Sequence, residues 1–145
     1  MTRINVVPVK ELSDQHLIAE YHELPRVIKQ NINTENAPDR YKLGEGHVRW
    51  ARVHCGYCME RYEALCKEMT FRGFKVTHTA GELYKLYIKL PRELHKYYLV
   101  TNDAILINRQ RLLEKYKAQP ALYTWTKRWK PWYYTWIGRL LCREI

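Results

Sequence analysis

A group of histidines and cysteines near the middle of this 145-residue chain has the composition of a metal site. It contains Cys55-x-x-Cys58, a spacing that zinc sites use, although such sites usually need a second closely spaced pair. Two of its cysteines also fit the apolar face of a predicted helix, where cysteine behaves as a small hydrophobic residue. We therefore favour a core role over zinc, and expect no metal and no cofactor. The group consists of His47, His54, Cys55, Cys58 and Cys66.

The start of the chain offers a second kind of chemistry. Thr2 is small enough for the initiator Met1 to be removed, which would leave a free α-amine. The pKa of such an amine is about 7.7–8.0, against about 10.4 for lysine, so a useful fraction is nucleophilic near neutral pH. Composition alone favours an ordinary frayed terminus at this position.

The charge of the chain points to polyanionic partners. Lysine and arginine number 25 against 15 acidic residues, a net charge of +10. Residues 101–145 hold nine basic and three acidic residues, interleaved with aromatic ones. Basic groups neutralise phosphates and rings stack on bases, but a flap packed on the protein's own core is the alternative, and both can hold. The residues concerned are Tyr123, Trp125, Trp129, Trp132, Tyr133, Tyr134 and Trp136, with Lys127, Arg128, Lys130 and Arg139.

The elements that must position these residues are helical. Apolar residues recur at helical spacing over residues 13–29, 55–72 and about 103–119. Pro25 should kink or interrupt the first helix, Gly73 is placed to end the second, and Pro120 stops the third. Ser13 or Asp14 is a suitable N-cap for the first helix, and a residue among 101–103 for the third.

The remaining segments read as loops. Residues 30–46 are polar and broken by proline and glycine, and residues 80–101 have irregular apolar content around Pro91. We therefore expect an all-α, single compact domain over residues 1–145. It has three main helices, long ordered loops and an aromatic-basic C-terminal tail.

The chain shows no sign of a membrane or secreted location. No stretch approaches the ~20 apolar residues that span a bilayer, and the first residues lack the apolar run of a secretion signal. Four cysteines are too few for a disulfide framework. We expect a reducing, cytoplasmic compartment and no membrane partner.

Several segments, in order along the chain, together resemble one known family. They are Met1-Thr2-Arg3-Ile4-Asn5, the run from Asp14 to Val27, Gly44-Glu45-Gly46-His47-Val48, Arg72-Gly73-Phe74, Arg111-Leu112-Leu113-Glu114-Lys115, and Pro120 with the aromatic-basic end. This pattern resembles the phage-type pyrimidine-dimer DNA glycosylases and abasic-site lyases, the ultraviolet-repair endonucleases of the T-even phages. The match is dense over the first 27 residues and thin between them and the tail.

The resemblance implies a mechanism and a set of catalytic residues. The Thr2 amine attacks C1′ of the damaged nucleotide, a Schiff base forms, and β-elimination cuts the strand. Glu23 is the catalytic carboxylate. Without the resemblance it would be one of several solvated helix acids, like Glu11 and Glu20, and only the resemblance selects it over Glu20.

The resemblance also implies contacts with DNA. Arg3, His22, Arg26, Arg111 and Lys115 are the candidate phosphate contacts. The family has an arginine where this chain has His22, a shorter side chain that is mostly neutral at pH 7, which weakens that contact. His16 is either a site residue or a satisfied, partly buried histidine, and His47 has a structural or DNA-facing role.

Other departures lie where the lesion pocket and the DNA grip would be shaped. Residues 48–53 replace a phenylalanine and tyrosine run followed by Asp-Lys, residues 30–42 form a shorter loop, and the tail is richer in tryptophan. Thr2 and Glu23 are intact.

The expected partner is double-stranded DNA containing damaged bases, most simply cyclobutane pyrimidine dimers. The protein would act as a monomer at the nucleoid of a bacterial or phage-infected cell. The alternatives are a non-catalytic DNA-binding module and a glycosylase of the same chemistry that acts on another damaged base.

Overall fold

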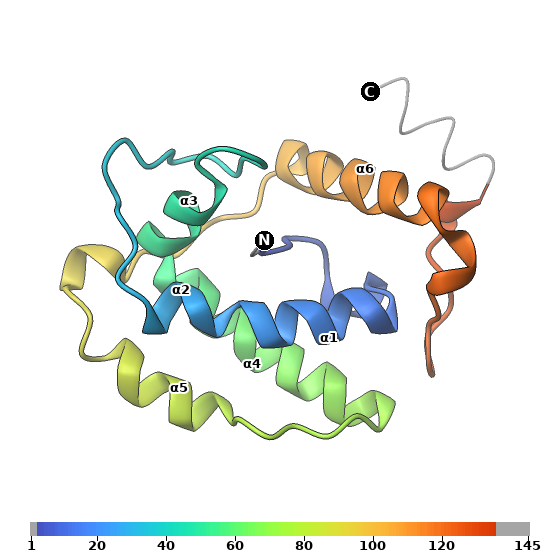
Figure 1. Ribbon diagram of the computed structural model, residues 1–145, viewed down its shortest axis with the longest axis horizontal. Coiled ribbons are helices and arrows are strands. Elements are labelled where there is room, and N and C mark those ends of the chain that lie inside the picture. Colours follow the sequence, from blue (N-terminus) through green and yellow to red (C-terminus); the bar gives the residue numbers. More distant parts are fainter. Residues whose placement is uncertain (1–2, 136–145) are drawn as a thin grey trace.

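Helices surround an extended N-terminal segment. The computed structural model describes residues 3–135, and every regular element among them is helical. The longest are α1 (Asp14–Glu23), α4 (Cys55–Arg72) and α6 (Asn102–Ala118), and residues 3–8 lie between α1 and α6 (Figure 1). The shorter elements are α2 (Pro25–Lys29), α3 (His47–Val53), α5 (Ala80–Tyr87) and the 3-10 turns Val9–Glu11, Arg92–Leu94, Pro120–Leu122 and Trp132–Tyr134.

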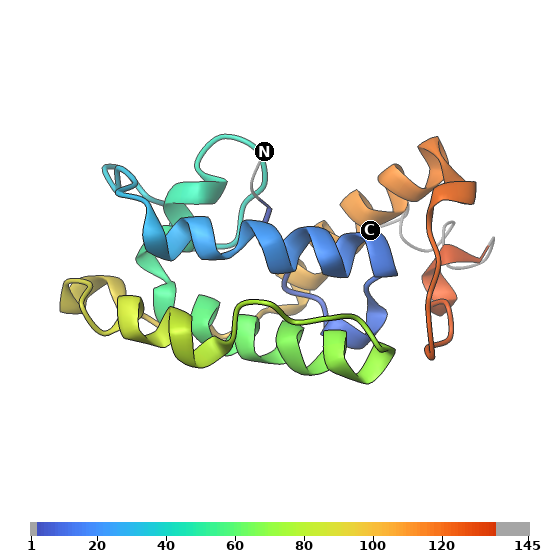
Figure 2. The ribbon, with the colours of Figure 1, turned by 60° about the horizontal axis from the view of Figure 1, so that its bottom comes forward.

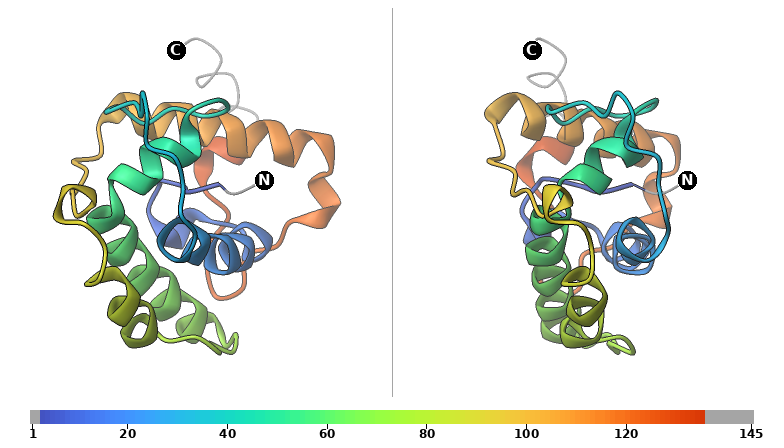
Figure 3. Two further views of the ribbon diagram at one scale, coloured as in Figure 1. Left: turned by 60° about the vertical axis from the view of Figure 1, so that its left-hand side comes forward. Right: turned by 90° about the vertical axis from the view of Figure 1, so that its left-hand side faces the viewer.

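The helices are arranged on two sides of α1. Helices α4 and α5 run side by side on one side of it (Figure 2), and α6 crosses on the other (Figure 3). The N-terminal segment therefore lies on the side of α1 that faces α6 (Figure 1).

The three predicted helices are confirmed, with their start and stop signals. The first is interrupted at Pro25, which begins α2 at a position where its missing N–H costs little. Ser13 caps α1 by accepting from the His16 N–H, and Thr101 caps α6 by accepting from the Ala104 N–H. Gly73 ends α4 with a φ of 91°, a left-handed conformation that glycine adopts without strain.

Two helices were not predicted. The expectation of an irregular segment over residues 80–101 is wrong at its start, where α5 is capped by Thr79 and carries Glu82 three residues later. Helix α3 has seven residues and begins after Gly46 without a side-chain cap. The prediction of three main helices therefore holds for the long ones, and the all-α class is confirmed.

The aromatic tail is largely part of the core. Tyr133 and Tyr134 are buried, and Trp125 packs against them while its indole N–H donates to the Glu11 carbonyl. Trp129, by contrast, is 95% exposed. The alternative of a flap packed on the core is thus correct for Trp125, Tyr133 and Tyr134, and the neighbours Trp132 and Tyr133 differ, since Trp132 is exposed. Trp136 and Arg139 lie outside the described residues.

The N-terminal segment buries its backbone without belonging to a helix or a sheet. Buried side chains take the place of a regular hydrogen-bond partner, as buried peptide groups require. The Asn108 Oδ1 accepts from the N–H groups of Val6 and Val7, at 2.7 and 3.1 Å. Tyr57 donates to the Asn5 carbonyl and Arg61 to that of Val7.

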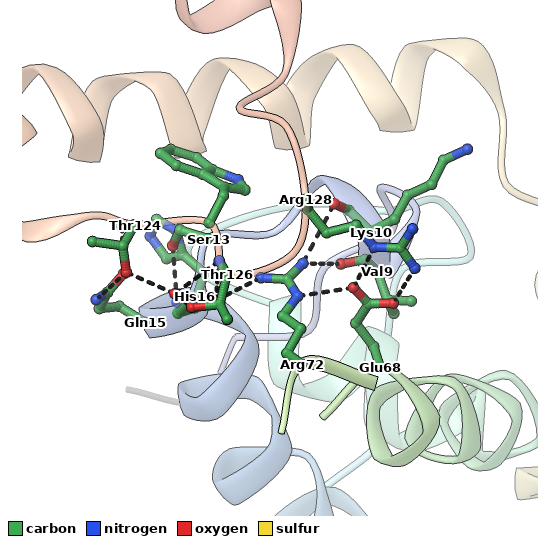
Figure 4. Close-up of polar contacts among 12 residues, drawn as sticks. Val9, Lys10, Ser13, Gln15, His16, Glu68, Arg72, Thr124, Thr126 and Arg128 are labelled. Atoms are coloured by element: carbon green, nitrogen blue, oxygen red, sulfur yellow. Dashed lines mark hydrogen bonds and ion pairs between the residues drawn. The ribbon is translucent and has the colours of Figure 1, made fainter. Parts of the chain in front are cut away.

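A network of buried charges joins α1, α4 and the tail (Figure 4). Arg72 donates to Asp14 at 3.0 Å and to Glu68 at 2.8 Å, and Glu68 also receives Arg128. Asp14 further accepts from Thr124 and from the hydroxyl and N–H of Thr126. Each buried charge is therefore compensated, and the network pins residues 124–128 against the start of α1.

The two carboxylates of this network have lowered pKa values. Burial alone would raise the pKa of Asp14, but the hydrogen bonds from Thr124, Thr126 and Arg72 outweigh it. The hydrogen bond from Arg128 is the main cause of the lowered pKa of Glu68, with further help from Arg72. Groups with a depressed folded-state pKa stabilise the protein above their unfolded values, about 3.9 for Asp and 4.3 for Glu, and lose that effect in acid.

We predict that the free energy of unfolding falls as the pH drops below about 4.3, because these carboxylates must then be protonated. Asp14→Asn should cost about 3–5 kcal/mol at pH 7, since it leaves buried Arg72 with one carboxylate fewer, and should flatten the acid dependence. Urea denaturation at several pH values measures the free energy of unfolding of the wild type and of the variant, and its dependence on pH. The control is Glu63→Gln, whose partner Lys67 is exposed and whose loss should cost less than about 1 kcal/mol. A similar loss in both variants would contradict the assignment.

Candidate active site

A polar pocket lies between α1, α6 and the N-terminal segment. Its volume is about 350 Å³, within the range of small-molecule sites. It is lined by Arg3, Asn5, His16, Ala19, Glu20, Glu23, Arg111, Leu112 and Lys115. Five of the residues predicted from the sequence therefore meet at one place, although they come from three separate parts of the chain.

Two glutamates of α1 reach this pocket, and the structure distinguishes them. Glu20 is buried, where Arg61 binds it at 2.8 Å and the Asn5 amide at 2.7 Å. The expectation that Glu20 is a solvated acid is therefore wrong. Glu23 has a side chain that is 28% exposed, and Arg26 lies 3.1 Å from its carboxylate. Glu23 is thus the carboxylate that an incoming substrate can reach.

Glu11 also differs from expectation. Its side chain is 14% exposed and accepts two hydrogen bonds from Arg109. Of the three acids compared in the sequence, Glu23 alone combines solvent access with a place in the pocket.

His16 forms one wall of the pocket and is a neutral base. Its ring stacks on Tyr123 at 4.7 Å between centroids, and its Nδ1 is 2.9 Å from the Ser13 hydroxyl. Burial, together with the positive charges of Arg3 and Lys115, lowers its pKa to about 4. His16 is thus a satisfied, partly buried histidine that also lines the pocket.

Three cations face the pocket. Arg3 belongs to the N-terminal segment, while Arg111 and Lys115 lie one turn apart on α6, as their spacing predicts. Burial, and secondarily the charge of Arg111, lowers the pKa of Arg3. Cations brought this close repel one another, so an anionic ligand between them is stabilised.

The remaining predicted residues fall outside the lining. His22 is exposed and its ring contacts that of Tyr21. Arg26 is also exposed and reaches the pocket only through its ion pair with Glu23. His47 is buried and does not line the pocket, and its Nε2 accepts a hydrogen bond from the Ile4 N–H. Thr2 lies outside the described residues.

Sequence reasoning missed Asn5, which lines the pocket, and Asn108, which contacts Asn5 from the core. Asn5 and Asn108 are both buried, and their side-chain amides are joined at 2.7 Å. The available signal was Asn108 itself, a polar residue four positions before Leu112 on the apolar stripe of a predicted helix.

Two of the three cysteines of the possible metal group lie in the core, and Cys66 is half-buried against it. Cys55 and Cys58 are buried, and burial raises the pKa of the Cys55 thiol to about 11. Over residues 3–135, no cluster of three or more histidine, cysteine or acidic side chains is arranged to hold a metal ion. His54, the remaining histidine of this group, uses its Nδ1 on the Trp50 carbonyl.

Comparison with protein families adds one finding to this geometry. The family model for pyrimidine dimer DNA glycosylase matches residues 1–81 of the chain. The chain belongs to the pyrimidine dimer DNA glycosylase family. It is therefore a DNA repair enzyme, a glycosylase and lyase whose substrate is damaged DNA.

The matched region contains only part of the glycosylase's pocket. Arg3, His16 and Glu23 lie within residues 1–81, whereas Arg111 and Lys115 lie beyond them on α6. Within the described part of this glycosylase, no helix has the length and apolarity to cross a membrane.

Lys115→Ala should weaken binding of the glycosylase to duplex DNA and reduce the slope of log affinity against log salt by about 0.9, the value for one phosphate contact. Fluorescence anisotropy between 50 and 300 mM salt, with DNA that carries a tetrahydrofuran abasic-site analogue, measures this slope. Lys67→Ala on α4 is the matched control, because Lys67 is exposed and does not line the pocket. An unchanged slope for Lys115→Ala would remove this residue from the DNA interface.

Proposed function

We propose that this glycosylase excises cyclobutane pyrimidine dimers from duplex DNA, with the α-amine of Thr2 as nucleophile and Glu23 as catalytic carboxylate. The observation that carries the proposal is that Arg3 and Glu23 line the same pocket together with Arg111 and Lys115. Thr2 is one peptide bond from Arg3, which keeps consecutive Cα atoms about 3.8 Å apart. After removal of Met1, the proposed nucleophile would belong to the residue directly before one that lines this pocket.

The pocket suits a nucleotide that has left the base stack. Enzymes that act on a base or its sugar extrude the nucleotide from the duplex, which is easiest at a damaged site. Three cations are available for the phosphates on either side, and the polar lining accepts a sugar. His22 on α1 and Arg26 on α2 are both exposed, and we assign them to the DNA backbone beyond the pocket.

The covalent step begins with the lone pair of the unprotonated amine. That pair forms a bond to C1′, and the glycosidic bond breaks with its electrons leaving on the base, which takes up a proton. Opening of the sugar ring then transfers the C1′–O4′ electron pair to O4′, which is protonated, and leaves a Schiff base between the nitrogen and C1′. Loss of a proton from C2′ expels the 3′ phosphate and cuts the strand. Hydrolysis of the Schiff base frees the enzyme.

Glu23 has three tasks that its place permits. Its negative charge stabilises the oxocarbenium-like charge that develops at C1′, and it assists proton transfer to the opening ring and from C2′. Arg26 holds its carboxylate from the solvent side. Glu20 is excluded from these tasks, because Arg61 and Asn5 already engage both of its oxygens.

The amine is tested by borohydride trapping on DNA with an abasic site. The wild-type enzyme should form a covalent adduct at neutral pH, and mass spectrometry should place it on Thr2 after loss of Met1. A form with one extra residue before Thr2 should form none, because the nucleophile is displaced by a residue's length. Equal trapping by the extended form would exclude the amine.

Glu23→Gln should lower the single-turnover rate of strand cutting at an isolated cyclobutane dimer by about 10²- to 10⁴-fold, the usual contribution of a positioned acid or base. Binding of the same duplex should change little, because the amide keeps the shape of the side chain. Glu63→Gln, on the exposed face of α4, is the control.

The lesion is assigned by comparing duplexes. Cutting of a dimer-containing duplex, with an undamaged duplex intact, supports the proposed substrate. Cutting at an abasic site and at an oxidised or alkylated base, but not at the dimer, would support the proposed mechanism but assign a different damaged base as the substrate. A Glu23→Gln rate equal to that of the wild type would remove Glu23 from the reaction.

A further inference from the structure

The backbone of Ile4 is held at both its N–H and its carbonyl. Its N–H donates to the Nε2 of His47 at 2.9 Å, and its carbonyl accepts from the Tyr41 hydroxyl at 2.9 Å. Ile4 and both partners are buried, so water does not replace either contact. Ile4 directly follows Arg3, the first described residue, so these contacts fix the direction in which the chain runs between the core and the pocket.

The contact at His47 depends on one form of its ring. The Nδ1 lies 2.7 Å from the Lys42 carbonyl, which can only accept a hydrogen bond. The proton of the neutral ring is therefore on Nδ1, and Nε2 is left with the lone pair that the Ile4 N–H needs. The ring itself is held by stacking on Trp50 and by the edge of Tyr41.

The surroundings keep His47 in that form. Burial lowers its pKa, the Lys42 carbonyl raises it, and the positive charge of Arg3 lowers it again, with a net lowering. These are the groups that face it from the N-terminal segment and the preceding loop, while its own helix contributes the uncharged Trp50. A proton on Nε2 would place an N–H of His47 opposite the Ile4 N–H, where neither can accept, and would add a positive charge close to Arg3.

We propose that His47 is a positioning residue for catalysis, which holds the Ile4 peptide and thereby sets where the amine two residues earlier stands in the pocket. This inference rests on the proposed role of the Thr2 amine. Covalent attack needs reacting atoms at about 3–3.5 Å and aligned, and a displacement of about 1 Å can lower a rate 10²-fold. Without His47 the Ile4 N–H is a buried donor with no acceptor, and the segment shifts to satisfy it.

The test separates positioning from folding. His47→Phe keeps a flat ring but removes both nitrogens, and His47→Gln keeps an amide oxygen that can reach the position of Nε2. His54→Phe is the matched control, because His54 is equally buried and packs on the same Trp50 ring, yet it contacts no residue of the N-terminal segment. The readouts are the single-turnover rate of borohydride trapping on abasic-site DNA and the dissociation constant for the tetrahydrofuran analogue, which cannot form a Schiff base.

We expect His47→Phe to trap about 10²-fold more slowly than the wild type with an unchanged dissociation constant. His47→Gln should recover most of the rate, and His54→Phe should trap like the wild type. The ratio of the wild-type rate to the His47→Gln rate should be constant near neutral pH and fall in acid, as His47 takes up its second proton. Thermal unfolding shows whether each variant is folded at the assay temperature. If His47→Phe is unfolded, it is replaced by Tyr41→Phe, which removes only the hydroxyl that binds the Ile4 carbonyl.

Three results would overturn the inference. The first is a trapping rate for His47→Phe equal to that of the wild type. The second is an equal loss of trapping rate in His54→Phe. The third is a ratio of wild-type to His47→Gln rates that does not change with pH. In each of them the wild type still traps, so the proposed function stands. Failure of the wild type itself to trap overturns the proposed function and this inference together.

Discussion

An extended segment inside a helical protein must find hydrogen-bond partners that no helix and no neighbouring strand provides. Residues 4–7 meet this requirement with side chains: His47 and Tyr41 on Ile4, Tyr57 on Asn5, and Asn108 on the two N–H groups that follow. These partners come from the loop before α3, from α3, from α4 and from α6. The positions of α3, α4 and α6 are therefore tied to the course of the N-terminal segment.

The same requirement explains the charged core. The Asn5 side chain is held by Glu20, Glu20 is held by Arg61, and Arg61 returns to the backbone at Val7. A loop of this kind contributes little net stability, but removal of one member leaves the others unpaired away from water. As a result, the two glutamates of α1 differ: Glu20 is fixed in the core, whereas Glu23, one turn later, is accessible to solvent in the pocket.

The long helices and the pairing of Arg111 with Lys115 could be predicted because both depend on periodicity within one segment. Helix α5 could have been found from Thr79 and Glu82, but Gly81 and the nearby Pro91 obscured it. Helix α3 could not, because a seven-residue helix that starts at Gly46 has too few turns for a pattern. The selection of Glu23 over Glu20 came from the family resemblance alone. The structural difference between the two glutamates, the buried Arg61 beside Glu20, depends on a contact across 41 residues that no local pattern contains.

The link between Asn108 and Val6 spans 102 residues of sequence, and that between Thr124 and Asp14 spans 110. A nascent chain emerges at about 5–20 residues per second, so the first segment waits roughly 5–20 s on the ribosome before α6 exists to receive it. Helical proteins of this size usually rely on short-range contacts and fold early, whereas this one completes its interior last. During that delay the N-terminal segment lacks the side chain that later receives two of its N–H groups.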